Sequence, residues 1–552
     1  MKFSFLAGNA LLAQFGICWT YGHLDATTDE IESEGFVTNN TKVTDKNIAN
    51  AKRAVEILQK QDEYPFEVRN QAYQIVCHTL EAIPPDDSHV LPALKKAISG
   101  SRLRVPSGDE PILRTELLER LRIYYEIVCW KYDRIVDGEI SRLAALNFPG
   151  GIPDNAEIVE SSDEIVIPGS IWGWISTGYY APSGGRIRVK TNAESVSKGC
   201  KLQIGANNDS LWSKEEWKRA PDVVVSCEIR DNETELCSPF GGLIYIDVGE
   251  PKDSPRTEFN ITVSGGIKAP RFVLNETDPD SDWNNHPAPW GELQTEKIIM
   301  TLPSNYLQEL ENPTELLTKW NAVMDCMAEL ADIPTERSRP ERIVVDIQIS
   351  AGYMHAGYPI MIQNNEAVPS MLDTEQIKAA RPVWGHFHEL GHNHQSDNWT
   401  FKGTREVTVN LFTMYAINTL CPDIDLAIIR DELNWDTIEK ETRAHIEAGA
   451  SYDKWKDDHW IALILFRQLQ YRFGWDAIKR FIASFHEPDY DMAHPESDED
   501  VRDQWVIRIS RVAQHNLGPF FEAWGIPFTD KARESVNDLP VWLPDVIKEM
   551  KK

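Results

Sequence analysis

Positive charge is scarce in this sequence. Its 56 lysines and arginines stand against 86 aspartates and glutamates, which gives a formal net charge of −30 at pH 7. A surface that binds nucleic acid or an anionic membrane needs clustered lysine and arginine. The composition therefore argues against nucleic acid as a partner. It is compatible with a soluble extracellular or luminal protein whose acidity serves solubility.

Long hydrophobic runs are missing beyond the N-terminus, so we expect no transmembrane segment. The first residues differ: Lys2 precedes an apolar run from Phe3 to Trp19, and small residues stand before His23. This pattern is typical of a secretory signal peptide, which we place at residues 1–22. It predicts a secreted or extracellular protein. The alternative is a buried N-terminal helix in a cytoplasmic protein.

Cysteine is sparse, with 8 residues and no C-x-x-C pair, which argues against a zinc site built from cysteines. Among the cysteines that follow the predicted signal peptide, we expect two disulfide bridges, Cys77 with Cys129 and Cys326 with Cys421. Acceptor motifs for N-glycosylation favour a glycoprotein in a secretory route. They lie at Asn39, Asn208, Asn232, Asn260, Asn275 and Asn398.

At 552 residues the chain is too long for one hydrophobic core, and we expect a multidomain protein. Helical spacing of apolar residues predicts an N-terminal helical domain, in which one helix carries Leu113, Leu117 and Leu121 on one stripe. Short β-type runs between turn residues then predict a β-sandwich. The expected segments are a signal peptide at 1–22, a flexible leader at 23–44, a helical domain at 45–147, a β-sandwich at 155–280 and, at 283–552, an α+β domain with a helical C-terminal part.

One motif of the last segment carries chemistry: residues 388–392 read H-E-L-G-H, an H-E-x-x-H pattern on an expected helix from Gly385 to Gln395. His388 and His392 are four positions apart, so they share one helix face and are able to hold one cation. Glu389 lies about 100° round the helix, beside the metal rather than bound to it. There it is expected to act as the general base that takes a proton from zinc-bound water.

A second expected helix, from Thr404 as its N-cap to about Leu420, supplies a third ligand. Glu406 and Asn410 lie four positions apart on one face of this helix. A carboxylate that faces inward is costly unless it is paired or bound to a metal, and Glu406 as a ligand satisfies this condition. Two histidines and one glutamate leave the fourth position of a zinc ion for water, as in catalytic sites. Asn410 is expected to brace the site from behind.

Zinc is therefore the expected cofactor and metal-dependent hydrolysis the leading interpretation, with a structural or inactive metal site as the alternative. His386 and His394 each lie two residues from a proposed ligand and face away from it; we favour surface positions over contacts with substrate. The oxyanion of a tetrahedral intermediate needs a donor besides zinc. The sequence does not choose among the candidates Tyr415, His355, Tyr358 and His459.

The residues around the motif, W-G-H-F-H-E-L-G-H-N at 384–393, resemble the signature of the enhancin-like gluzincin peptidases. In that family H-E-x-x-H is followed at variable distance by a glutamate ligand. Residues 349–359 and 519–526 agree, and 174–182 are similar to the β-module before the peptidase domain. The resemblance covers about residues 155–540 and extends to the TRPM channel-associated factors.

The resemblance implies a gluzincin-like metallopeptidase domain in which His388, His392 and Glu406 hold zinc and Glu389 is the base. It also implies a protein substrate that is heavily glycosylated, of the mucin type. We therefore expect a zinc-dependent endopeptidase that hydrolyses peptide bonds in such proteins. The channel-associated relatives are described as regulators, so the alternative is a non-catalytic binding or regulatory protein on a peptidase scaffold.

Overall fold

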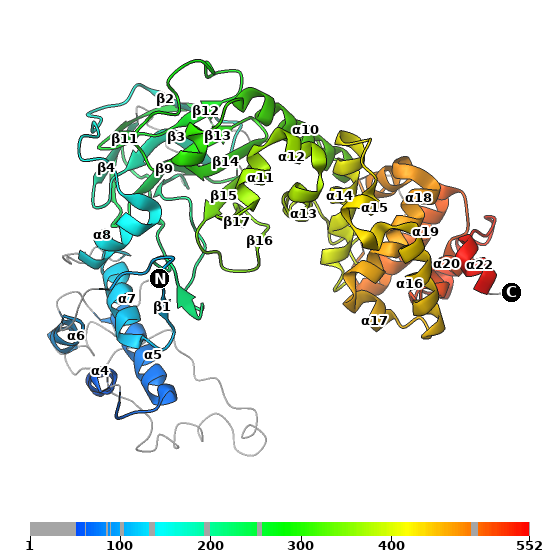
Figure 1. Cartoon of the computed structure of the whole chain (residues 1–552), viewed down its shortest axis with the longest axis horizontal. Coiled ribbons are helices and arrows are strands. Elements are labelled where there is room, and N and C mark those ends of the chain that lie inside the picture. The colour runs from blue at the N-terminus through cyan, green and yellow to red at the C-terminus, as the bar shows by residue number, and fades with distance from the viewer. Residues whose placement is uncertain are drawn as a thin grey trace. The chain divides into compact units, whose positions relative to one another are not determined.

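The computed structural model describes residues 51–550, apart from residues 61, 84–86, 89, 100–103, 132–138, 192–198, 251–256 and 487–494 (Figure 1). The predicted signal peptide at 1–22 and flexible leader at 23–44 lie outside the described residues. The described chain divides into two compact units. The first extends to Ala269 and includes His286–Trp290 and Ile347–Ser350, whereas the second holds Pro270–Asn285, Gly291–Asp346 and the chain from Ala351 onward.

The N-terminal part of the first unit is helical. Apolar residues at helical spacing on its helices meet in one core, in which Leu58, Val76, Leu94 and Leu121 are almost completely buried. The helices that contribute to this core are α4 (Ala51–Gln59), α5 (Phe66–Ala82), α6 (Leu91–Ile98) and α7 (Leu117–Lys131), and α8 (Glu139–Ala145) follows α7.

The predicted helical stripe begins too early. Leu113 belongs to strand β1 (Ile112–Leu113), which pairs antiparallel with β6 (Glu216–Trp217), and it is 46% exposed. Arg120 on α7 supports this pairing, because its guanidinium donates hydrogen bonds to two carbonyl oxygens of the segment before β6, at 2.7 and 2.9 Å. Hydrogen bonds to a strand about a hundred residues away override the local pattern, which carries no sign of them.

Neither predicted disulfide bridge is formed. Cys77 and Cys129, on α5 and α7, are both thiols, as are Cys326 and Cys421 in the second unit. All four are buried, where cysteine packs as a small apolar residue. Burial raises the pKa of Cys326 to about 12, so this side chain stays a neutral thiol.

Two sheets in the rest of the first unit share one hydrophobic core. One has the strand order β2-β10-β4-β8 and the other β11-β3-β9-β5-β7. In β4 the inward residues Ile187 and Val189 alternate with exposed charged residues, which is the pattern of a sheet with one buried face. The strands are β2 (Ile165–Ile167), β3 (Gly173–Ala181), β4 (Arg186–Thr191), β5 (Lys201–Ile204), β7 (Val225–Glu228), β8 (Glu233–Cys237), β9 (Gly242–Val248), β10 (Phe259–Ser264) and β11 (Ile267–Lys268).

A further sheet, of order β12-β13-β14-β15-β17-β16, supports the second unit. β14, β15 and β17 pair in parallel, and β16 pairs antiparallel with β17 at the edge. Every residue of β15 is buried, as expected for a strand covered on both faces. The strands are β12 (Arg271–Val273), β13 (Trp290–Gln294), β14 (Ile298–Pro303), β15 (Glu341–Asp346), β16 (Met354–His355) and β17 (Ile360–Gln363).

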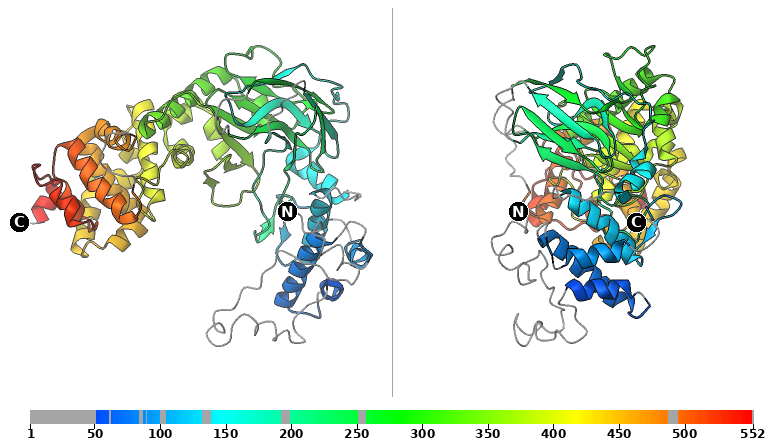
Figure 2. Two further views of the ribbon diagram at one scale, coloured as in Figure 1. Left: turned by 180° about the vertical axis from the view of Figure 1, so that it is seen from behind. Right: turned by 90° about the vertical axis from the view of Figure 1, so that its left-hand side faces the viewer.

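Helices make up the remainder of the second unit (Figure 2). The long helix α10 (Pro313–Ala331) packs against α14 (Arg405–Leu420) and α18 (His459–Ala483), and α18 also packs against α19 (Asp498–Ala513). Within the described residues, no helix has the length and apolar content needed to cross a membrane. The expected combination of N-terminal helices, several sheets and a helical C-terminal part is thus confirmed. The other helices are α9 (Ser304–Gln308), α11 (Ala367–Leu372), α12 (Thr374–Ala379), α13 (Trp384–His392), α15 (Leu426–Ile429), α16 (Trp435–Glu447), α17 (Tyr452–Asp457), α20 (Gly518–Ala523), α21 (Asp530–Glu534) and α22 (Asp545–Met550).

Candidate metal centre

The H-E-x-x-H motif lies on α13, which follows directly on a short 3-10 turn, Arg381–Val383. The helix ends at His392, earlier than the predicted end at Gln395, and Asn393 is its C-cap. His388 and His392 are four positions apart, so they project from the same face, and their ring centroids are 4.6 Å apart.

Helix α14 begins at Arg405, so Glu406 lies in its first turn, where a negative charge interacts favourably with the helix dipole. The predicted capping by Thr404 is wrong: its side chain accepts no cap hydrogen bond, and its hydroxyl donates to the carbonyl oxygen of Phe401 at 2.9 Å. The start of the helix is therefore fixed by the loop before it rather than by a side-chain cap.

Gly391 allows α13 and α14 to approach each other closely. A Cβ atom added there would lie 2.9 Å from Cγ2 of Val409, 3.1 Å from the carbonyl oxygen of Val409 and 3.0 Å from Cβ of Phe412. Only a residue without a side chain fits between these atoms. The contact sets how far the first turn of α14 lies from the two histidines.

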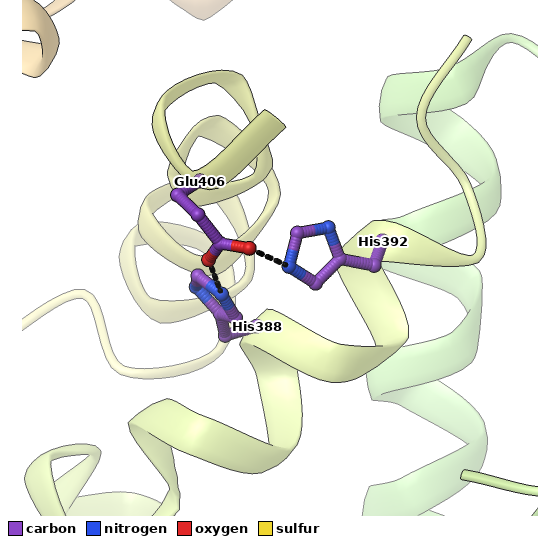
Figure 3. A group of neighbouring side chains, drawn as sticks. All are labelled: His388, His392 and Glu406. Carbon is purple, nitrogen blue, oxygen red and sulfur yellow. Dashed lines mark hydrogen bonds and ion pairs between the residues drawn. The ribbon is translucent and has the colours of Figure 1, made fainter. Parts of the chain in front are cut away.

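The three predicted ligands converge (Figure 3). Nε2 of His388 lies 3.0 Å from one carboxylate oxygen of Glu406, and Nε2 of His392 lies 3.4 Å from the other. One donor atom from each of the three residues lies within 4.8 Å of the other two. The hydrogen bonds from both histidines lower the pKa of Glu406, so its carboxylate is held in the charged form.

Two amide side chains fix the orientation of the imidazoles. Oδ1 of Asn410 lies 3.0 Å from Nδ1 of His388, and Oε1 of Gln395 lies 2.7 Å from Nδ1 of His392. The orientation of each amide is fixed, because its nitrogen donates to a backbone carbonyl oxygen. Asn410 donates to the carbonyl of Glu406, and Gln395 donates to that of Arg405. Both Nδ1 atoms therefore carry a proton. Each Nε2 carries a second proton when it donates to Glu406 and offers its electron pair when the ring is neutral.

The donor atoms of this cluster fit a zinc ion. Two imidazole nitrogens and one carboxylate oxygen point at one another, and all three carry electron pairs when the histidines are neutral. Such a group needs either protons or a cation between its members. Two histidines and one glutamate are a ligand set found in catalytic zinc sites. Such sites typically also contain residues that orient the histidine rings by hydrogen bonds.

Glu389 lies beside the cluster without joining it, as its place on the helix predicts. Its side chain is half-buried, and burial raises the pKa of its carboxyl, although the neighbouring His388 and His392 oppose this effect. His355, on the edge strand β16 next to α13, also interacts electrostatically with Glu389. A carboxylate whose pKa is raised above its ordinary value is better suited to accept a proton near neutral pH.

The other candidate donors lie in different places. Tyr358 follows β16, and the guanidinium of Arg339 stacks over its ring at 4.4 Å. Tyr415 faces away from the cluster: its ring packs against Trp475 at 5.1 Å, and its hydroxyl interacts with Glu329 on α10. Tyr415 as an oxyanion donor is therefore a wrong prediction, because α14 turns this residue toward α10 and α18.

His386 and His394 are both buried, so the surface positions predicted for them are wrong. His386 is 1% exposed and packs against Trp320 of α10, and burial lowers its pKa to about 4. His394 is 7% exposed; its Nδ1 donates to the carbonyl oxygen of Leu390 at 2.6 Å, and its Nε2 accepts from Arg337 at 2.7 Å. Both predictions fail because α13 is covered by protein on the faces away from the ligands.

Gln395 and Asn393 are the functional residues that the sequence analysis missed. The sequence predicts Gln395 only as the end of the helix, yet it follows His392 by three positions and therefore reaches the same ring. That spacing was the available signal. Asn393 bonds to both backbone groups of Gly357, and no local pattern reveals this partner.

We expect Gly391→Ala to weaken zinc binding and to lower thermal stability. The added methyl group overlaps Val409 and Phe412, so α14 must move and carry Glu406 with it. Overpacking of this kind costs about 1–3 kcal/mol. Zinc affinity measured against a competing chelator, together with the melting temperature, tests this. In Gly108→Ala a Cβ meets nothing within 4 Å, so this control should behave as wild type. Unchanged zinc affinity in Gly391→Ala would contradict the role of the close contact.

Replacement of Gln395 tests the orientation of the second histidine. Gln395→Leu removes the acceptor for Nδ1 of His392, and we expect zinc affinity to fall about 10- to 100-fold. Gln395→Glu keeps an acceptor and should lose less. Calorimetric titration of the zinc-free variants measures both constants. Equal affinity in Gln395→Leu and wild type would show that the ring needs no such partner.

Solved structures of metallopeptidases share the fold. The catalytic module of the metalloprotease ZmpA from Clostridium perfringens matches with a TM-score of 0.53 at 16% identity, over 70% of this chain and 80% of that chain. IMPa from Pseudomonas aeruginosa, solved in complex with an O-glycopeptide, matches with a TM-score of 0.55 at 14% identity, over 89% of this chain and 62% of that chain. At these identities the likeness concerns the fold alone.

Sequence comparison is more specific. Human TRPM8 channel-associated factor 2 is 36% identical over 381 residues, which are 68% of this chain and 40% of the relative. Human TRPM8 channel-associated factor 1 is 36% identical over 390 residues, or 69% of this chain and 41% of the relative. The chain thus spans about 40% of the length of these relatives. Residues 163–264 match the model of the N-terminal domain of M60-like peptidases, and residues 265–525 match that of peptidase M60, enhancin and enhancin-like. The chain belongs to the M60 family of enhancin and enhancin-like peptidases.

Proposed function

We propose that this protein is a zinc-dependent endopeptidase that hydrolyses peptide bonds in glycosylated, mucin-like proteins. The observation that carries the proposal is the convergence of His388, His392 and Glu406 with both imidazoles held so that Nε2 faces the cluster. A set of side chains oriented in this way by further residues is typical of a working metal site rather than of a chance group of polar residues.

His388, His392 and Glu406 would hold the ion. When bound there, zinc supplies Lewis-acid chemistry, which polarises a peptide carbonyl and makes water more acidic. Glu389 is the residue of this chain that moves the proton: its carboxylate accepts one from water and later donates it to the leaving amine. Its partial burial supports this role, because burial raises the pKa of the carboxyl toward the working range. His355 and Tyr358, on the segment beside α13, and His459, at the start of α18, remain the candidates for binding the oxyanion.

The substrate class is supported by family and by fold. The M60 family match covers the segment that carries the cluster. One structure of similar fold contains an O-glycopeptide, and another is of a metalloprotease. These properties belong to those proteins; for this chain they support a glycosylated protein as the substrate.

A non-catalytic binding or regulatory role is the second candidate. It is favoured by one observation: the curated relatives at 36% identity are channel-associated factors, whereas the structures of metallopeptidases match at 14–16% identity. In that case the cluster would hold a metal for structure, and a partner protein would replace the substrate.

Glu389→Gln separates the two functions. The amide has nearly the same shape but accepts no proton, so we expect cleavage of a mucin-type glycoprotein to be abolished while about one zinc per chain is retained. Metal analysis and a gel assay of substrate cleavage, run on wild type and variant together, measure this. Glu439→Gln, the same change at an exposed position of α16, should cleave as wild type does.

Two results would overturn the assignment. Cleavage that is unaffected by Glu389→Gln would rule out Glu389 as the base. Wild-type protein that holds zinc but hydrolyses no glycosylated substrate would favour the binding role.

We also propose that the protein passes through a secretory route. In support, the acceptor residues Asn208, Asn232 and Asn275 are exposed, as attachment of a glycan requires. Protein secreted from eukaryotic cells should therefore shift to lower apparent mass after treatment with an N-glycosidase. The absence of a shift, or a mature chain that begins at Met1, would contradict the proposal.

A further inference from the structure

One face of α13 follows a neighbouring segment of the chain, residues 354–358, which we call the wall segment. Gly385, Glu389 and Asn393 are spaced four positions apart and share this face. A Cβ atom added at Gly385 would lie 3.2 Å from the sulfur of Met354, at the start of the wall segment. The next residue of the wall segment, His355, interacts electrostatically with Glu389. The wall segment therefore runs along the helix face that carries the proposed base.

Asn393 binds the far end of the wall segment with its whole side-chain amide. Its Nδ2 donates to the carbonyl oxygen of Gly357 at 2.9 Å, and its Oδ1 accepts from the backbone N–H of Gly357 at 3.1 Å. The second hydrogen of Nδ2 goes to Oε2 of Glu341 at 2.8 Å. A primary amide, with two donor hydrogens and an acceptor oxygen, meets all three demands.

Glu341 anchors this arrangement in the sheet. It lies on β15 and is 3% exposed. Its other oxygen lies 3.5 Å from the guanidinium of Arg339, which in turn stacks over the ring of Tyr358 at 4.4 Å. Two adjacent residues of the wall segment are thus held from one buried carboxylate, Gly357 through Asn393 and Tyr358 through Arg339.

Capping of α13 does not explain the side chain of Asn393. As the C-cap residue it uses its backbone N–H, which donates to the carbonyl oxygen of Gly391. All three side-chain hydrogen bonds go to residues outside the helix. The amide therefore serves the connection between the helix, the sheet and the wall segment.

We infer that Asn393 is a positioning residue, which fixes the wall segment against the face of α13 that carries Glu389. The inference rests on the proposed function, because it assigns the space in front of Glu389 to the reacting peptide. The wall segment bounds that space and carries two of the remaining oxyanion candidates, His355 and Tyr358. A displaced wall should therefore impair the chemical step while the metal ligands, on the neighbouring stripe of the helix, stay in place.

Asn393→Asp tests the inference with little change in size. The acceptor for the N–H of Gly357 remains, but the two donor hydrogens are replaced by a carboxylate oxygen that faces Glu341 and the carbonyl of Gly357. We expect kcat/KM for glycoprotein hydrolysis to fall about 10- to 100-fold, the usual effect of a small displacement of reacting groups. Zinc per chain should equal that of wild type. Asn393→Ala breaks the same hydrogen bonds without adding charge. It should likewise lower kcat/KM while zinc per chain stays at the wild-type value.

Partial rescue distinguishes this role from a general loss of structure. Added to Asn393→Asp, the change Glu341→Gln supplies an amide donor for the new carboxylate, and kcat/KM should recover in part. Asn434→Asp is the matched control: Asn434 caps α16 by accepting from the N–H of Asp436, which aspartate also does. Its kcat/KM should equal that of wild type.

Hydrogen–deuterium exchange gives a second readout that does not depend on activity. In both Asn393 variants, peptides covering residues 354–358 should exchange faster than in wild type, while those of α14 stay unchanged. If wild type hydrolyses no substrate but this exchange pattern is seen, the proposed function is wrong, whereas the role of Asn393 in fixing the wall segment is supported. Unchanged exchange, or wild-type kcat/KM in both variants at full zinc content, would overturn the inference. A loss of activity that follows loss of zinc would overturn it too.

Discussion

The close contact between α13 and α14 is the constraint on which the rest of the site depends. It brings the first turn of one helix to the histidines of the other, and Gly391 is the residue that permits it. If the helices stood further apart, the two histidines would lack Glu406 as a third partner. Distance between helices is set by the side chains at the contact, so a single missing Cβ decides whether three donor atoms converge.

The orientation of the rings is a separate matter from their position. An imidazole on a helix is able to turn, and either nitrogen is able to carry its proton. Asn410 and Gln395 remove this freedom, because each amide is itself fixed by a backbone carbonyl of α14. The helix that supplies the third ligand therefore also orients the other two. Pairing of this kind makes the cluster one cooperative unit.

Each face of α13 contacts a different part of the protein. The stripe with His388 and His392 faces Glu406, the stripe with Glu389 and Asn393 faces the wall segment, and His386 is buried against α10. A helix covered on so many sides has little tolerance for change. The burial of His386 also shows that a histidine beside a metal motif need not lie on the surface.

The sequence by itself determined much of this site. The spacing of His388 and His392 follows from the geometry of an α-helix. The sequence also selects Glu406, with Asn410 one turn further along, but the reason given for Glu406 is wrong: the side chain does not face inward and is 64% exposed. Helix positions, the alternation in strands such as β4 and the helical C-terminal part follow from local periodicity in the same way.

Only the tertiary structure decided what depends on residues far apart in the chain. The pairing of β1 with β6 took Leu113 out of its predicted helix, and the cover on α13 buried His386. The turn of α14 carried Tyr415 toward α10, and the sheet placed Glu341 where it holds Asn393. Local periodicity records which face of an element is apolar. It does not record which partner covers that face, because the partner is chosen by packing over the whole unit.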